Sequence, residues 1–132
     1  MRRLLLLSAL LFVSLQWSAF SSAKDPEQVL STRHFDIIYS PPSEAAALLL
    51  AEYADGFADE ICSFLNAPLK DRIPVYLDAR VEDINGYYTG HPYSRIYLYD
   101  TVPLEGSLAV FSDSLLMIFY HELTHAVSLT MR

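Results

Sequence analysis

The chain has 132 residues, of which 16 are acidic and nine are basic, and its formal net charge at pH 7 is −7. This length favours one small domain with a single core, and the acidic balance argues against nucleic acid as a partner. Because the acidic residues are scattered along the sequence, they indicate the solvated surface of a domain. Cys62 is the only cysteine, so the chain has no internal disulfide, and we expect a core thiol there.

The N-terminus has the features of an export signal. Arg2 and Arg3 form a positively charged start, Leu4 to Leu15 form an apolar stretch, and Ser21-Ser22-Ala23 supplies small residues before a cleavage site. An uncleaved membrane anchor is the alternative, but the stretch is shorter than the roughly 20 residues that span a bilayer. We therefore expect residues 1–23 to be a signal peptide. The mature chain would be exported to the periplasm, cell envelope or exterior, with seven basic and 16 acidic residues and a net charge of −9.

Three short segments between positions 34 and 99 are rich in residues that favour strands, and turn residues lie next to them. They predict strands at His34–Tyr39, Ile73–Asp78 and Arg95–Tyr99. Gly106–Phe111 predicts a short edge strand. The intervening segment Asn85–Tyr93 is rich in turn residues and aromatic residues, and is interpreted either as a hairpin tip or as a substrate-facing loop.

Two segments have the pattern of helices. Ser43 is expected to cap a helix over Glu44–Asn66, where apolar residues recur at helical spacing. Ser112 or Asp113 is expected to cap a second helix that is apolar on nearly every side and therefore buried. The order strand, helix, strand, strand, short strand, helix predicts an α+β fold, with a small mixed β-sheet packed on two helices.

The second helix contains the sequence His121-Glu122-Leu123-Thr124-His125. Residues four apart share one face of a helix, so both histidines can bind one Zn²⁺ at about 2.0 to 2.1 Å. Glu122 is turned about 100° around the helix axis, where its carboxylate can lie beside a metal-bound water and act as general base. The pattern predicts amide hydrolysis by zinc-activated water. A structural histidine pair without metal is the alternative interpretation.

The residues around this motif, Phe119 to Ala126, resemble the peptidase-MA-like branch of the gluzincin zinc metallopeptidases. The segments His34–Tyr39 and Asn85-Gly86-Tyr87-Tyr88 add to the resemblance, which covers nearly all of the mature chain. It implies a zincin-like N-terminal subdomain over residues 24–132. It also implies an edge strand before the active helix that holds an extended peptide substrate, here Gly106 to Phe111.

By this resemblance His121 and His125 are zinc ligands and Glu122 is the general base and acid. Gluzincins take their third zinc ligand from a glutamate on a later helix, whereas this sequence stops at Arg132. The resemblance therefore implies a fragment that lacks the C-terminal half and its ligand. Upstream residues that could substitute as the third ligand are His91, Asp100, Glu105 and Asp113.

Absence of the C-terminal half also predicts an exposed apolar patch on the second helix. Its members would be Leu115, Met117, Phe119, Leu123 and Val127.

Three functions of different class follow from the sequence. The chain is an exported zinc metallopeptidase or a fragment of one, acting on a peptide or protein. Alternatively, it is an inactive module that binds a peptide or partner chain on the same scaffold, or a structural remnant. Contact with a membrane is expected only through an uncleaved signal.

Tyrosines are concentrated between the second strand and the last predicted strand. We interpret most of them as sheet residues that pack their rings and extend their hydroxyls to water. A role in gripping substrate is the alternative for two of them, Tyr87 and Tyr88. The concentrated set is Tyr87, Tyr88, Tyr93, Tyr97 and Tyr99.

Overall fold

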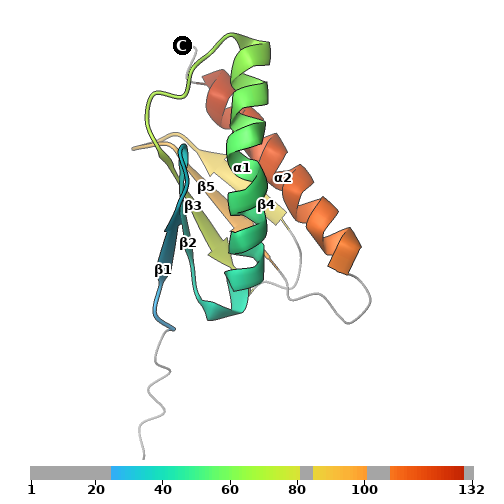
Figure 1. The fold of residues 1–132 in the computed structure, drawn as a ribbon. Coiled ribbons are helices and arrows are strands. Elements are labelled where there is room, and N and C mark those ends of the chain that lie inside the picture. Colours follow the sequence, from blue (N-terminus) through green and yellow to red (C-terminus); the bar gives the residue numbers. More distant parts are fainter. Residues whose placement is uncertain (1–24, 81–84, 101–107, 130–132) are drawn as a thin grey trace, which may run out of the picture.

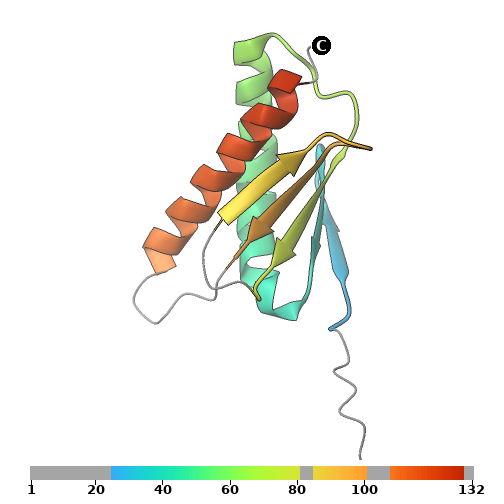
Figure 2. The same cartoon turned by 180° about the vertical axis from the view of Figure 1, so that it is seen from behind.

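Within the described part of the chain, a five-stranded sheet carries two α-helices on one of its faces (Figures 1 and 2). The structure, a computed structural model, describes residues 25–80, 85–100 and 108–129. It confirms the predicted α+β class and mixed sheet. The elements in chain order are β1 (Gln28–Ser31), β2 (Phe35–Tyr39), the 3-10 helix η1 (Pro41–Ser43), α1 (Glu44–Leu65), β3 (Ile73–Asp78), β4 (Asn85–Thr89), β5 (Arg95–Tyr99) and α2 (Leu108–Leu129).

The sheet has the strand order β1-β2-β3-β5-β4. Strands β2, β3 and β5 run parallel, while β1 is antiparallel to β2 and β4 is antiparallel to β5. Helix α1 forms the crossover from β2 to β3, because parallel neighbours cannot be joined by a tight turn. Both edge strands are therefore antiparallel to their neighbours, and β4 forms the edge on the side of α2 (Figure 2).

The three predicted strands are present, but two predictions about the remaining strands need correction. Asn85–Thr89 is not a hairpin tip or loop but strand β4, and the turn between β4 and β5 is confined to residues 90–94. The predicted edge strand Gly106–Phe111 is wrong where it is described, because Leu108–Phe111 is the first turn of α2, while residues 106 and 107 lie outside the described residues. Ser112 and Asp113 consequently lie inside the helix and do not cap it.

Side chains alternate strictly across the central strands, and one set faces the helices. In β2 the residues Phe35, Ile37 and Tyr39 are buried, and β3 and β5 repeat this pattern. Helix α1 buries mostly alanines, whose small side chains allow neighbouring elements to approach its backbone closely. Its buried residues are Ala46, Ala47, Leu50, Ala54, Ala58 and Ile61.

The predicted apolar patch on α2 is mostly wrong. Four of its five members have a side-chain exposure of 0%, because spacing of four residues places them on one face, and that face packs on the sheet and on α1. These residues are Leu115, Phe119, Leu123 and Val127. Met117 is turned away from them and is 68% exposed.

Helix α1 matches its prediction to within one residue. It ends at Leu65, and Asn66 adopts a left-handed conformation with φ of 50°, where its N–H and that of Ala67 close the last turn on helix carbonyls. Ser43 occupies the N-cap position, but its hydroxyl does not bond to the helix. Cys62 is partly buried against the core, in agreement with its predicted place. No helix in the described ranges has the length and apolarity needed to cross a bilayer.

Gly86 allows α2 to approach the edge strand closely. A Cβ atom at this position would lie 2.8 Å from the Ile118 Cγ2 and Leu98 Cδ2 atoms and 3.0 Å from the Tyr97 carbonyl oxygen. We expect Gly86→Ala to lower the free energy of unfolding by about 1 to 3 kcal/mol, since a methyl group there displaces a packed helix. Chemical denaturation measures the change.

A control for this substitution lies in α1, where a Cβ at Gly56 meets nothing within 4 Å. Gly56→Ala should raise stability by up to about 1 kcal/mol, because alanine is the better helix former. Equal effects of the two substitutions would contradict the close packing of α2 on β4.

Candidate metal centre and the neighbouring edge strand

His121 and His125 point their Nε2 atoms at each other from the exposed side of α2. The two nitrogens are 3.1 Å apart, and the ring planes are inclined by 86°. Two nitrogens bound to one tetrahedral zinc at about 2.0 to 2.1 Å stand about 3.3 Å apart. The two imidazoles are hydrogen-bonded to each other at 3.1 Å, which is also close to the spacing of two ligands on a single ion. The expectation that these histidines would be buried with their helix is wrong, because both lie open to solvent.

Glu122 lies on the inner side of α2, which faces the core, whereas the two histidines lie on its exposed side. It is 9% exposed, and no described residue donates a hydrogen bond to its carboxylate or forms an ion pair with it. Among the described residues the fully buried side-chain atom without a hydrogen-bond partner is Arg95 Nε, so the Glu122 carboxylate is not an orphaned buried charge. The motif thus places two neighbouring imidazoles on the exposed side of α2 and one largely buried acid on its inner side.

Strand β4 borders the helix that carries the motif. Helix α2 packs along α1 on one side and along β4 on the other, and Ile118, three residues before His121, lies against Gly86. Among the described strands β4 has a single neighbour, β5, so its outer backbone groups have no strand partner there. Among the described residues the edge strand next to the motif is therefore β4, while Leu108–Phe111, part of the segment predicted for this role, is helical.

None of the proposed upstream third ligands joins the histidine pair. In residues 25–80, 85–100 and 108–129, no group of three His, Cys, Asp or Glu side chains gathers closely enough to hold one metal ion. His91 lies exposed in the turn after β4, and Asp113 lies exposed near the start of α2. Glu105 lies outside the described residues. Asp100 is 3% exposed and is engaged elsewhere.

Asp100 connects the end of β5 to the start of α1. Its Oδ1 accepts a hydrogen bond of 3.0 Å from the Ser43 hydroxyl, and its N–H donates to the Asp78 carbonyl oxygen at 3.1 Å. Burial raises the pKa of the Asp100 carboxyl to about 6, although the bond from Ser43 acts in the opposite direction. This explains why Ser43 does not cap α1: its hydroxyl is used by Asp100.

The raised pKa of Asp100 predicts that stability depends on pH. Between about pH 4 and pH 6 the folded chain holds a proton that the unfolded chain has lost, so rising pH favours unfolding. We expect this carboxyl to contribute a loss of about 2 kcal/mol across that window. Urea unfolding at successive pH values should show a flatter profile for Asp100→Asn. An unchanged profile would show that Asp100 does not titrate in this way.

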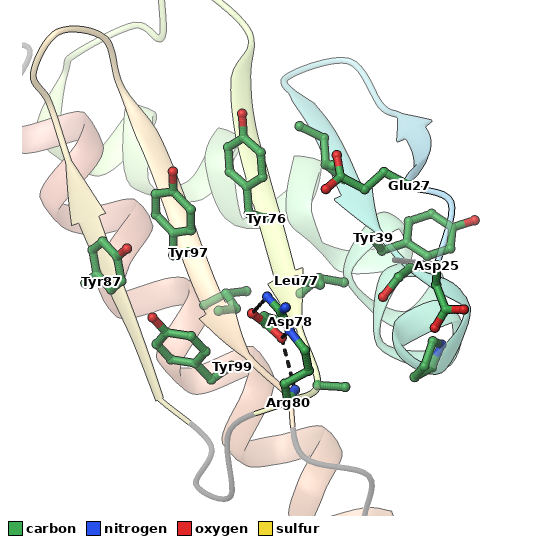
Figure 3. A pocket seen from close by; sticks show the side chains of 15 residues that line it. Asp25, Glu27, Tyr39, Tyr76, Leu77, Asp78, Arg80, Tyr87, Tyr97 and Tyr99 are labelled. Carbon is green, nitrogen blue, oxygen red and sulfur yellow. Dashed lines mark hydrogen bonds and ion pairs between the residues drawn. The ribbon is translucent and has the colours of Figure 1, made fainter. Parts of the chain in front are cut away.

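The open face of the sheet, opposite the helices, carries a row of aromatic rings (Figure 3). Tyr97 is stacked between Tyr76 and Tyr87, with ring centroids 4.8 Å apart on each side. Beside the row, Arg80 forms a two-point ion pair with Asp78, and both residues line a groove of about 620 Å³. The tyrosines of β4 and β5 are sheet residues, as predicted. Sequence analysis missed the row itself, although Tyr87 and Tyr97 alternate at a period of two.

Comparison with known proteins gives a relative but no activity. The chain is similar to an uncharacterized protein of Treponema pallidum (strain Nichols), with 43% identity over 103 residues, which are 76% of this chain and 10% of the relative. It thus spans about a tenth of the length of that relative. No family model matches the chain, and no solved structure matches it.

Proposed function

We propose that the His121 to His125 segment is the zinc site of an exported metallopeptidase of the gluzincin type, whose remaining parts lie in a longer polypeptide. The observation that carries this proposal is a pair of Nε2 atoms 3.1 Å apart on the helix that also carries the largely buried Glu122. A catalytic zinc needs a third protein ligand and an open position. The proposal therefore requires one ligand from outside the described residues.

The residues of this chain can be given distinct tasks in amide hydrolysis. Bound zinc would supply Lewis acidity and lower the pKa of a water molecule. His121 and His125 would hold the ion on a helix fixed by its buried face. Glu122 would take a proton from the attacking water and deliver it to the leaving amine, and its burial keeps the carboxylate in one place for both transfers.

The free edge of β4 gives the substrate a place to bind. An extended peptide could pair its backbone with the outer edge of this strand, as in other cases of strand addition to a sheet. Because β4 runs beside α2, such a peptide would pass close to the histidine pair. Main-chain pairing of this kind selects extended peptides and requires no particular side chain.

A catalytically inactive peptide-binding module is the second candidate. The observation that favours it is that the described residues supply two metal-binding side chains and no third. The β4 edge would then bind the peptide without cleaving it. The two candidates differ in whether Glu122 matters, because only hydrolysis needs a general base.

The test compares zinc-loaded wild type with Glu122→Gln in hydrolysis of an unstructured protein such as casein. Loss of the general base should lower the rate by two to four orders of magnitude while zinc stays bound. The control is Glu52→Gln, an exposed acid on α1, which should leave the rate unchanged. Equal rates for wild type and Glu122→Gln would contradict the proposal. Peptide binding without hydrolysis would favour the binding module.

A further inference from the structure

The exposed side of α2 carries a stripe of four residues at a spacing of four. Met117 and Leu129 stand at its ends with exposures of 68% and 46%, and the two histidines of the motif stand between them. The stripe therefore has the order apolar, imidazole, imidazole, apolar. The peptidase proposal uses its two central residues and gives no role to Met117 and Leu129.

This order is symmetric about position 123 of the helix. If a second copy of α2 packs antiparallel across a two-fold axis through that point, His121 lies opposite the partner's His125. Met117 then lies opposite the partner's Leu129. Such an interface is self-complementary, as a two-fold symmetric contact requires. Apolar residues would meet at its two ends and four imidazoles at its centre.

The centre of this interface would meet the coordination preference of zinc. Each copy supplies two nitrogens 3.1 Å apart, close to the edge of a tetrahedral site, and two such pairs supply four ligands. The described residues of one copy supply two ligands and no third. The acidic character of the chain opposes association of two copies, and a dication at the axis reduces that repulsion.

We infer that two copies of this chain bind one Zn²⁺ between their α2 helices, through His121 and His125 of each copy. This inference rests on the zinc binding proposed above and adds the partner. Four imidazoles fill a tetrahedral shell and leave no position for water. The bridged dimer is therefore an inactive form of the site, and hydrolysis requires its dissociation and another third ligand.

The experiment titrates Zn²⁺ into the full chain while sedimentation velocity follows its mass and a chromophoric chelator follows free metal. We expect the mass to double at one zinc per two chains and to return to the monomer value with EDTA. Because both histidines are exposed, His121→Ala and His125→Ala should fold normally by circular dichroism and remain monomeric. The control His91→Ala changes an exposed histidine outside the stripe and should dimerise like wild type.

A second variant separates the interface from the ligands. Met117→Glu keeps both histidines but places a carboxylate opposite the partner's Leu129, and should raise the zinc concentration needed for dimerisation about 10-fold or more. One zinc per monomer would overturn the bridge and leave the proposed metal site intact. Absence of zinc binding would overturn both. A dimer that persists in EDTA with unchanged affinity would also overturn the bridge.

Discussion

His121→Ala should lower the zinc affinity of the chain by a factor of about 100 or more, because it removes one of the two converging imidazoles. Removal of either histidine leaves a single nitrogen, which cannot fix the ion on the helix. Both side chains are exposed, so the loss should occur without loss of folded structure. Competition with a chelator of known zinc affinity measures the effect.

A control on the same helix sharpens this prediction. Asp113→Ala removes an exposed acid eight residues before His121, and it should leave zinc affinity unchanged, because Asp113 is not gathered with the pair. A comparable loss in both variants would make Asp113 a ligand and contradict the described arrangement. Retention of full affinity in His121→Ala would place the zinc site elsewhere.

Phe119→Ala should produce the largest loss of stability, about 3 to 5 kcal/mol, since it empties the centre of the core. Its ring is fully buried and meets Phe35 edge to face at 5.4 Å, so the substitution removes contacts between α2 and the sheet. The free energy of unfolding in urea gives the measurement.

Met117→Ala serves as the matched control, two residues away on the exposed side. It should change stability by less than about 0.5 kcal/mol, as expected for a surface position. Similar losses at Phe119 and Met117 would mean that the buried and exposed faces of α2 are not those described. This pair therefore tests which face of the motif helix packs on the sheet.

The main elements of the fold follow from local patterns, whereas β1 does not. Helix α1 and strands β2, β3 and β5 were predictable because their apolar residues recur at a period of 3.6 or 2. β1 has one half-buried residue, Leu30, and exposes the rest. The turn that joins it to β2 is held from a distance, because Asp55 of α1 accepts bonds from the Thr32 hydroxyl and two backbone N–H groups. Such long-range contacts leave no local pattern.

Helix α2 shows a second limit of local patterns. The run Leu108 to Phe111 is short and continuously apolar, and such a run does not distinguish a strand from a helix. Because apolar residues occur on nearly every side of α2, the sequence did not indicate which side of the helix is exposed. The structure resolves this through packing, because α1, β4 and β5 cover one side and leave Met117 and the histidines uncovered.

For the candidate site, the spacing of the two histidines predicted that their side chains lie close together, but it did not predict which elements surround them. Residues four apart share one face of any helix, so the neighbouring positions of the two histidines were predictable from sequence. The place of β4 beside them was not, because it depends on sheet order and on the missing side chain at Gly86. The burial of Glu122 likewise depends on how α2 sits against the sheet.

X-ray absorption at the zinc edge of the zinc-loaded chain tests the central claim most directly, because it reports the atoms bound to the metal. The account predicts imidazole scattering with zinc to nitrogen distances of about 2.0 to 2.1 Å. This scattering should weaken in His125→Ala. A spectrum with oxygen ligands alone, or one unchanged by that substitution, would contradict a metal centre at His121 and His125.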